Sequence, residues 1–257
     1  MDVLSIAVKG IIYNFCKIPK GSFVMGANDF LSNAAPPHKV ELTRDFYMLE
    51  TAVTQRLWKD LMGTDVEQQL HLKGSDKLYG VGDDLPMYYV NWFEVNNFLI
   101  RFNMRLHANH PTLTANLPTE AQWEYACRAN TYTPYYWGDG LNGSQANCNG
   151  NYPYGMYKPG PFVQRVLPVK SFAPNNWGLY EMLGNVWEWC KDNYAADYYA
   201  QSPVKDPQGA TNTERKVIRG GGWRSYAWCC RSAFRDSDPP DYRGRTLGFR
   251  IIIEENI

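Results

Sequence analysis

Gly178-Leu-Tyr-Glu-Met-Leu-Gly-Asn-Val-Trp-Glu-Trp189 is the stretch of the sequence that decides the fold, and four further motifs accompany it. Upstream lie Gly21-Ser-Phe-Val-Met-Gly26 and Leu117-Pro-Thr-Glu-Ala-Gln-Trp-Glu-Tyr-Ala126. Downstream lie Arg219-Gly-Gly-Gly-Trp223 and Leu247-Gly-Phe-Arg250. Each motif alone is a weak signal. Together they extend over most of the chain, from about residue 17 to residue 253, and so predict one fold for it.

Three predicted helices each begin after a residue that commonly caps helix N-termini. They are Gln55 to Met62 after Thr54, a run to Phe102 after Asn91, and Glu120 to Arg128 after Thr119. The second and third also have a glutamate or glutamine three residues after the cap, which is the capping-box pattern. In the second helix Val95, Phe98 and Phe102 recur at helical spacing, which predicts a face that packs against the core.

Short apolar runs broken by glycine, proline and asparagine predict strands in the rest of the chain. These runs are 21–25, 39–46, 166–172, 216–220 and 247–253. We expect the first and the last to pair and to bring the termini together. No internal repeat or linker marks a domain boundary. The sequence therefore predicts a single α+β domain, residues 1–257, with much irregular loop.

The five motifs resemble those of the formylglycine-generating-enzyme family, also called sulfatase-modifying factors. The resemblance implies the C-type lectin fold of that family, with small twisted antiparallel sheets, two or three helices and long irregular loops. Its enzymes oxidise a cysteine of sulfatases with two cysteines of their own, a few residues apart after the glycine motif. Here the matching stretch contains only the adjacent Cys229 and Cys230. Neighbouring thiols ligate one metal only with strain, so we expect no enzymatic activity.

The C-terminal motifs resemble something more particular, the variable region of proteins diversified by retroelements, of the treponemal type. The framework of that region is matched by Arg219 to Trp223, Ala227, Cys230 to Ala233, Arg235, Pro240, Asp241, Arg243 and Leu247 to Arg250. In that family reverse transcription rewrites adenines, chiefly in AAC codons for asparagine. The resemblance implies a variable region at about residues 219–250. Its rewritten, ligand-binding positions would be Arg224, Ser225, Tyr226, Trp228, Cys229, Phe234, Asp236, Ser237, Asp238, Pro239, Tyr242, Gly244, Arg245 and Thr246.

The residue types at these fourteen positions agree with that interpretation. Changing the first two bases of AAC cannot produce Lys, Glu, Gln, Met or Trp, and only Trp228 breaks this rule. The segment mixes aromatic residues with Ser, Asp, Gly, Arg and Pro. Paratopes favour this mixture, because rigid rings give contact area at low entropic cost while small polar side chains adapt their hydrogen bonds. The alternative is a surface loop whose aromatic residues pack into the core.

The framework residues of this segment are expected to hold its backbone in place. Asp241 would form an ion pair with Arg243 or with Arg235. The glycines 220–222 would allow backbone conformations that are closed to other residues.

Glu181, Gly184, Val186 and Glu188 match a calcium site of the enzyme family, in which two side-chain oxygens and two backbone carbonyls surround the ion. The first family ligand is usually asparagine, and Glu181 replaces it. The alternative is a structural turn in which Glu188 forms an ion pair. A second family site requires an acidic residue where this chain has Lys170, so we expect that site to be absent. The resemblance thus implies no required cofactor and allows calcium.

The composition excludes two classes of partner. Lys and Arg total 26, as do Asp and Glu, so no positive excess would draw the chain onto phosphate backbones. No stretch approaches the roughly 20 apolar residues that span a bilayer. We therefore expect no nucleic-acid partner and no membrane span.

The sequence predicts a non-catalytic ligand-binding protein of receptor type, whose C-terminal surface is diversified by a retroelement. Its partner would be an unknown protein or other macromolecular ligand. Members of the variable family are exported, often as lipoproteins on the bacterial cell surface. The resemblance implies the same here, with a signal that lies outside these 257 residues. The alternative function is that of a formylglycine-generating oxidoreductase with rearranged cysteines.

Overall fold

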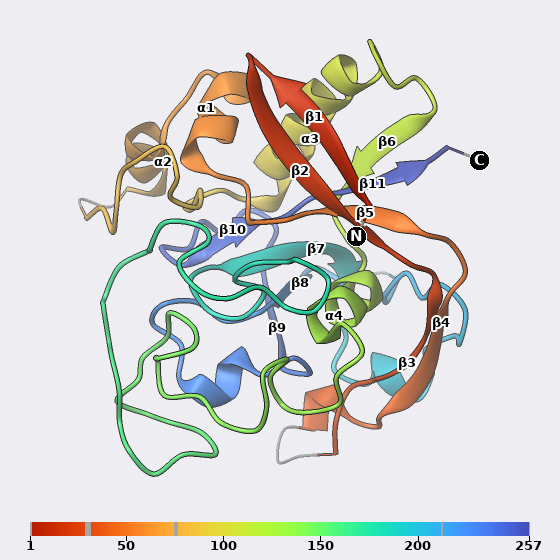
Figure 1. Ribbon diagram of the computed structural model, residues 1–257, viewed down its shortest axis with the longest axis vertical. Helices are drawn as coiled ribbons and strands as arrows, with labels where there is room; N and C mark the ends of the chain where they lie inside the picture. Colours follow the sequence, from red (N-terminus) through yellow and green to blue (C-terminus); the bar gives the residue numbers. More distant parts are fainter. Residues whose placement is uncertain (1, 29–31, 75–76, 212, 257) are drawn as a thin grey trace.

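The computed structural model describes residues 2–28, 32–74, 77–211 and 213–256 (Figure 1). Within these ranges the chain forms a five-stranded, a four-stranded and a two-stranded sheet, four α-helices and long loops. The α+β class predicted from the sequence is confirmed.

The five-stranded sheet joins the two ends of the chain. Its strands run in the order β1 (Val3–Val8), β2 (Ile11–Ile18), β5 (Phe46–Leu49), β11 (Ile252–Glu255) and β6 (Leu113–Asn116), and all neighbours are antiparallel. β1 and β2 form a hairpin whose turn residues, Lys9 and Gly10, have φ angles of 47° and 83°. Two positive φ angles match the twist of the flanking strands. This hairpin was not predicted from the sequence.

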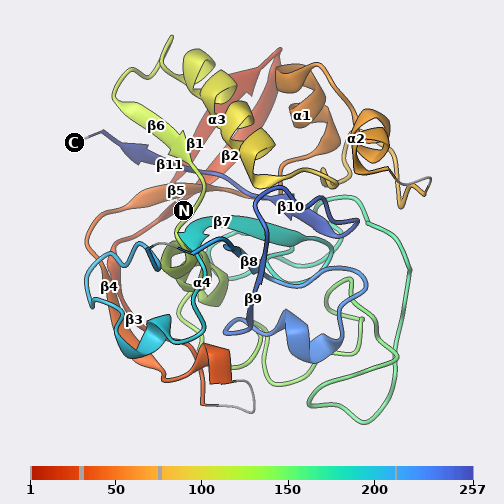
Figure 2. The same ribbon diagram turned by 180° about the vertical axis from the view of Figure 1, so that it is seen from behind.

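The four-stranded sheet lies near the middle of the molecule in both views (Figures 1 and 2). Its strands run in the order β10 (Leu247–Phe249), β7 (Trp187–Asn193), β8 (Lys216–Arg219) and β9 (Arg235–Asp238). β10 is parallel to β7, whereas the other pairs are antiparallel. The third sheet pairs β3 (Gly21–Met25) with β4 (His38–Leu42).

The four α-helices of the described ranges are α1 (Gln55–Met62), α2 (Val66–Lys73), α3 (Trp92–Leu106) and α4 (Glu120–Arg128). Three short 3-10 helices accompany them: η1 (Ser32–Ala34), η2 (Tyr198–Ala200) and η3 (Ala227–Cys230). The three predicted caps are confirmed, because the side chains of Thr54, Asn91 and Thr119 each accept the backbone N–H three residues on. α2 was not predicted, since most of its residues are polar. No helix in the described ranges is long and apolar enough to cross a membrane.

Three of the predicted strands and one predicted strand pairing differ from the structure. The run 39–46 divides into β4 and β5, and 247–253 divides into β10 and β11. The run 166–172 forms no strand, because two of its backbone N–H groups donate to the buried Glu181 carboxylate instead of to a neighbouring strand. β3 pairs with β4 and not with the C-terminal run, whose strand β11 lies between β5 and β6.

Two clusters of buried side chains form the core. In the first, Trp58 of α1 stacks on Phe98 of α3 with ring centroids 5.8 Å apart, and Phe249 of β10 meets Phe98 edge-on at 5.0 Å. The second surrounds α4 and contains Cys127 and Cys190, both fully buried. The C-terminal segment runs between these clusters, so its fixed residues contact both.

A buried ion pair joins the two larger sheets. Arg250, which follows β10, places its Nη2 atom 2.9 Å from Oε1 of Glu188 on β7. Its Nη1 donates to the carbonyl of Leu49 on β5 at 3.0 Å. Neither charged side chain is more than 1% exposed. The guanidinium therefore neutralises a carboxylate that has no access to water and also fixes the distance between the sheets.

Replacing Arg250 by methionine is expected to lower the free energy of unfolding by about 3–5 kcal/mol, because Glu188 then stays buried without a counter-charge. Urea unfolding followed by circular dichroism measures the loss. Arg56→Met is the matched control: Arg56 is 40% exposed where it pairs with Asp60 and Asp83, and its loss should cost at most about 1 kcal/mol. Equal losses in the two variants would contradict the role given to Arg250.

Candidate functional site

The segment from Arg219 to Arg250 leaves the four-stranded sheet and returns to it twice. After β8 the chain turns, forms η3 and comes back as β9, which pairs with β8. It then loops out again before β10 pairs with β7. All fourteen predicted variable positions lie on η3, on β9 or on the connecting loops.

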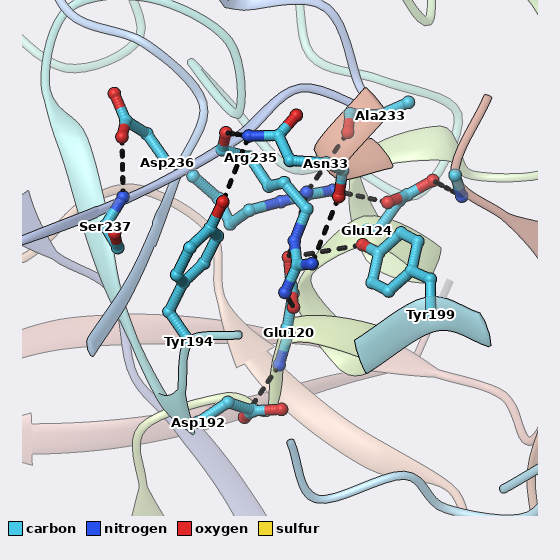
Figure 3. A network of polar contacts seen from close by, with 12 residues as sticks. Asn33, Glu120, Glu124, Asp192, Tyr194, Tyr199, Ala233, Arg235, Asp236 and Ser237 are labelled. Atoms are coloured by element: carbon cyan, nitrogen blue, oxygen red, sulfur yellow. Dashed lines mark hydrogen bonds and ion pairs between the residues drawn. The ribbon is translucent and has the colours of Figure 1, made fainter. Parts of the chain in front are cut away.

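Two buried carboxylates of α4 hold the framework arginines of this segment (Figure 3). Arg219 Nη1 lies 3.1 Å from Glu120 Oε1, and its Nη2 pairs with Glu124. Arg235 Nη2 lies 2.7 Å from Glu120 Oε2, and Arg235 Nε donates to the other oxygen at 2.8 Å. The Tyr199 hydroxyl also donates to Glu120, at 3.2 Å. Because these four charged side chains are at most 2% exposed, each charge depends on its partners.

The ion pairs predicted within the segment are not the ones that form. Asp241 was expected to pair with Arg243 or with Arg235. Arg235 instead pairs with Glu120, and Arg243 Nη2 lies 2.8 Å from Glu94 Oε1 on α3. Both arginines reach away from the loop toward shielded carboxylates, where opposite charges attract more strongly than in water.

Gly220 and Gly221 turn the chain out of β8, which confirms the prediction for two of the three glycines 220–222, because Gly222 has no positive φ angle. Their φ angles are 94° and 76°, in the left-handed region that other residues rarely adopt. A Cβ atom on Gly221 would also lie 2.5 Å from Sγ of Cys230. Any larger residue there would push η3 away from the core.

Exposure separates the predicted framework from the predicted variable positions. Every framework residue is buried except Pro240, Asp241 and Arg243. Eleven of the fourteen variable residues, in contrast, are exposed or partly exposed. These eleven are Arg224, Ser225, Tyr226, Trp228, Cys229, Asp236, Asp238, Pro239, Tyr242, Arg245 and Thr246.

The remaining three variable positions are buried: Phe234, Ser237 and Gly244. The Phe234 ring packs between Trp187 and Trp228, at centroid distances of 5.9 and 5.3 Å. Phe234, predicted among the ligand-binding positions, therefore does not lie on the exposed surface. Its apolar ring fills a site in the core instead.

Aromatic rings form a row over η3. Tyr226 and Trp228 lie with ring centroids 6.4 Å apart, and Tyr152 continues the row at 4.3 Å from Tyr226. Tyr152 belongs to a loop far from the variable segment and was not predicted. The Asn149 N–H, which donates to the Ser225 carbonyl at 2.9 Å, holds that loop against the segment. Long-range backbone contacts of this kind make Tyr152 part of the site.

Tyr242 lies in a second part of the site, beside the end of α2. The Lys73 ammonium lies 4.8 Å from the centroid of its ring, within cation–π distance. A shallow groove of about 280 Å³ is lined here by Leu72, Lys73, Pro239, Asp241, Tyr242 and Arg243. Nearby, Arg245 donates to the Tyr79 hydroxyl at 2.9 Å. Lys73 was not predicted, because its helix was not.

The adjacent cysteines are poorly suited to thiolate chemistry. Burial raises the pKa of the Cys229 thiol to about 12. A hydrogen bond with Cys148, together with burial, raises the pKa of Cys230 well above its usual range. Since the thiolate is the form that attacks disulfides and binds metals, neither group is prepared to react at neutral pH.

The four residues of the predicted calcium site are Glu181, Gly184, Val186 and Glu188. Glu181 accepts two hydrogen bonds from backbone N–H groups of the loop 170–172, at 2.9 and 3.1 Å. Glu188 accepts from Trp123 Nε1 at 2.8 Å and pairs with Arg250. Both oxygens of each carboxylate are thus already engaged by protein donors, and this arrangement does not fit a calcium ion. The alternative prediction, a turn with Glu188 in an ion pair, describes the geometry that forms.

The described residues form small sheets, four helices and long loops, and both ends of the chain join one sheet. These features define the C-type lectin fold of the formylglycine-generating-enzyme type. The chain belongs to the sulfatase-modifying factor family, since the family model for the sulfatase-modifying factor enzyme 1-like domain matches residues 9–255. The fold and the family resemblance predicted from the sequence are both confirmed.

Two curated relatives and one solved structure illustrate the range of the family. Formylglycine-generating enzyme of Streptomyces coelicolor is 42% identical over 142 residues, 52% of this chain and 45% of that protein. Serine/threonine-protein kinase pkn1 of Chlamydia caviae is 29% identical over 250 residues, 91% of this chain and 37% of that protein. The chain thus spans less than half of either relative. Treponema denticola variable protein 1 is 25% identical, with a TM-score of 0.78 over 97% of this chain and 98% of its own.

Asp192 lies next to the arginine network, at the N-terminus of α4 (Figure 3). Its Oδ2 accepts the Glu120 backbone N–H at 3.0 Å. Burial and the nearby Glu120 carboxylate raise the pKa of Asp192 from 3.8 to about 7. Between about pH 4 and pH 7 the folded chain therefore holds a proton that the unfolded chain has released, so this group reduces stability as the pH rises.

Asp192→Asn is expected to remove this contribution. The free energy of unfolding of the variant minus that of the wild type should increase as the pH rises from 4 to about 7. Above pH 7 this difference should stay constant. Urea unfolding at several pH values measures it. Asp139→Asn, at an exposed position, serves as the control and should keep the wild-type slope. A variant difference that is constant with pH would contradict the assignment to Asp192.

The division between buried framework and exposed face predicts opposite effects of truncation. Trp223→Ala and Phe249→Ala should each cost about 3–5 kcal/mol, because both side chains are at most 2% exposed. Tyr226→Ala and Tyr242→Ala remove rings that are 40% exposed and should change stability by at most about 1 kcal/mol. Thermal and urea unfolding test both pairs. The division is wrong if all four variants lose stability equally.

Proposed function

We propose that the chain is a non-catalytic ligand-binding protein of receptor type, and that a retroelement diversifies its surface between Arg224 and Thr246. The observation that carries this proposal is the burial pattern: all framework residues except Pro240, Asp241 and Arg243 are buried, and eleven of the fourteen rewritten positions are exposed or partly exposed. The outward residues can change without breaking the pairs of Arg219 and Arg235 with α4. The likeness to Treponema denticola variable protein 1 supports the same role.

The chemistry of the face favours a protein or another macromolecular ligand. Its exposed and partly exposed rings, Tyr152, Tyr226, Trp228 and Tyr242, are of the types that dominate binding energy at protein interfaces. The groove beside Tyr242 holds about 280 Å³, slightly less than the usual pocket for a small molecule. The balanced charge of the chain argues against a nucleic-acid ligand.

A non-catalytic role is supported by the state of the two adjacent thiols. Formylglycine formation in the parent family depends on reactive cysteines, whereas burial raises the pKa of Cys229 to about 12. The competing function is that of a formylglycine-generating oxidoreductase with rearranged cysteines, and the 42% identity to the Streptomyces coelicolor enzyme is the observation in its favour.

The proposal includes export to the bacterial cell surface, where the protein would be held as a lipoprotein. It requires no cofactor. A face built to change its specificity is useful where it meets partners outside the cell, and the variable proteins that the sequence resembles are placed there.

The experiment that tests the proposal is deep sequencing of the coding region for residues 187–250 in a population grown from one cell that expresses the retroelement reverse transcriptase. Substitutions are expected at the codons for the fourteen variable positions, mainly at their first two bases. The framework codons between them and the β7–β8 codons upstream are the internal control and should stay unchanged.

Substitutions spread evenly over framework and variable codons, or an invariant segment, would contradict diversification. A formylglycine assay then separates the remaining functions. Conversion of a sulfatase-type cysteine peptide by the purified chain, abolished in a Cys229→Ser, Cys230→Ser double variant, would establish the enzyme instead.

A further inference from the structure

Two cysteines that are far apart in the sequence meet beneath the variable segment. Cys148 belongs to the long loop 141–165, and Cys230 is the last residue of η3. Both side chains lie in the second core cluster, and the nearness of Cys148, together with burial, raises the pKa of the Cys230 thiol. Cys148 is 1% exposed and Cys230 is fully buried, and both are free thiols.

Backbone contacts on both sides keep these thiols together. The Asn149 N–H donates to the Ser225 carbonyl at 2.9 Å, and the Ala227 N–H donates to the Tyr152 carbonyl at 3.2 Å. The Tyr135 hydroxyl donates to the Ala227 carbonyl at 2.8 Å. The two chain segments are therefore already held side by side. A disulfide forms readily only between two cysteines whose backbones lie close together.

The neighbouring Cys229 is partly exposed and lies in different surroundings. It packs against the first core cluster, whereas Cys148 and Cys230 both belong to the second. Two other buried thiols have oxygen partners: Cys127 Sγ lies 3.6 Å from Ser232 Oγ, and Cys16 Sγ lies 3.6 Å from the Gly178 carbonyl. The shared cluster and the joined backbone segments thus favour the pairing of Cys148 with Cys230.

We infer that Cys148 and Cys230 form a disulfide under oxidising conditions, and that this bond fastens the loop 141–165 beneath the variable segment. The two thiols lose two protons and two electrons as the S–S bond forms. A small disulfide such as oxidised glutathione accepts them and is cleaved to two thiols. Because both cysteines are enclosed in the folded chain, the exchange takes place during folding.

The bond has a consequence for both stability and binding. It closes a long loop of the unfolded chain, which lowers the entropy gained on unfolding. It also fixes Tyr152 next to Tyr226 in the aromatic row. A face whose rings are held in position before binding loses less entropy when a ligand binds.

The test is to unfold the full chain with reductant and refold it in a mixture of reduced and oxidised glutathione. Remaining thiols are alkylated in denaturant, and the unreduced digest is read by mass spectrometry. The expected result is a cross-link between the peptide of Cys148 and the peptide of Cys229 and Cys230, with fragment ions that assign it to Cys230. The protein should carry two fewer alkyl groups than chain refolded with reductant alone.

Two variants separate the neighbouring cysteines. Cys229→Ser should keep the cross-link, and Cys230→Ser should lose it. A link that persists through Cys229 in the second variant overturns the pairing, as does folded wild-type chain without any cross-link. If Cys230→Ser fails to fold, the fragment ions of the wild-type cross-link still decide between the two sulfurs.

Thermal unfolding tests the stabilising role. The oxidised wild type should melt several degrees above the reduced wild type, and reductant should abolish the difference. Cys229→Ser should retain this difference. An oxidised protein that melts at or below the reduced one would overturn the inference that the bond fastens the loop.

Discussion

Buried pairs between carboxylates and guanidinium groups are the constraint on which the C-terminal part of the molecule depends. Glu120 and Glu124 stand one turn apart on α4, and Arg219 and Arg235 reach them from β8 and β9. A buried charge that loses its partner costs about 3–5 kcal/mol, a large share of a total stability of about 5–15 kcal/mol. Both strands must therefore keep their arginines in place. As a result, the segment between β8 and β9 leaves the sheet and returns to it at fixed points.

This constraint lets fixed and changeable residues alternate closely along the chain. On β9, Arg235 points into the core, whereas the next residue, Asp236, is exposed, because successive side chains of a strand point to opposite faces. Around η3, Ala227 and Cys230 are buried, while Tyr226 between the glycine turn and the helix is exposed. Neighbours in sequence thus meet different surroundings, and selection for folding and selection for binding act on different side chains.

Local sequence signals revealed three helices with their caps but missed α2 and the β1–β2 hairpin, and long-range pairing was not predictable from them. The caps of three helices act within three residues, so one sequence reveals them. The position of β11 between β5 and β6 depends on contacts between distant segments, and no local pattern encodes it. The same holds at the site. Residue types from 224 to 246 indicated an outward face, but Tyr152 joins it only through the fold. Phe234 is buried, unlike most of the variable residues, and its residue type did not reveal this difference.

Phe234 fills an apolar site between two tryptophans, although it belongs to the set that a retroelement would rewrite. An AAC-type codon changed at its first two bases can encode Asp, Arg or Ser, and such a side chain would be buried there without a partner. Copies that receive one would fold poorly and be lost before they met any ligand. The number of functional receptors in a population would then depend on the fraction of copies that still fold. That fraction is set by the few codons for buried positions, and not by how many codons change.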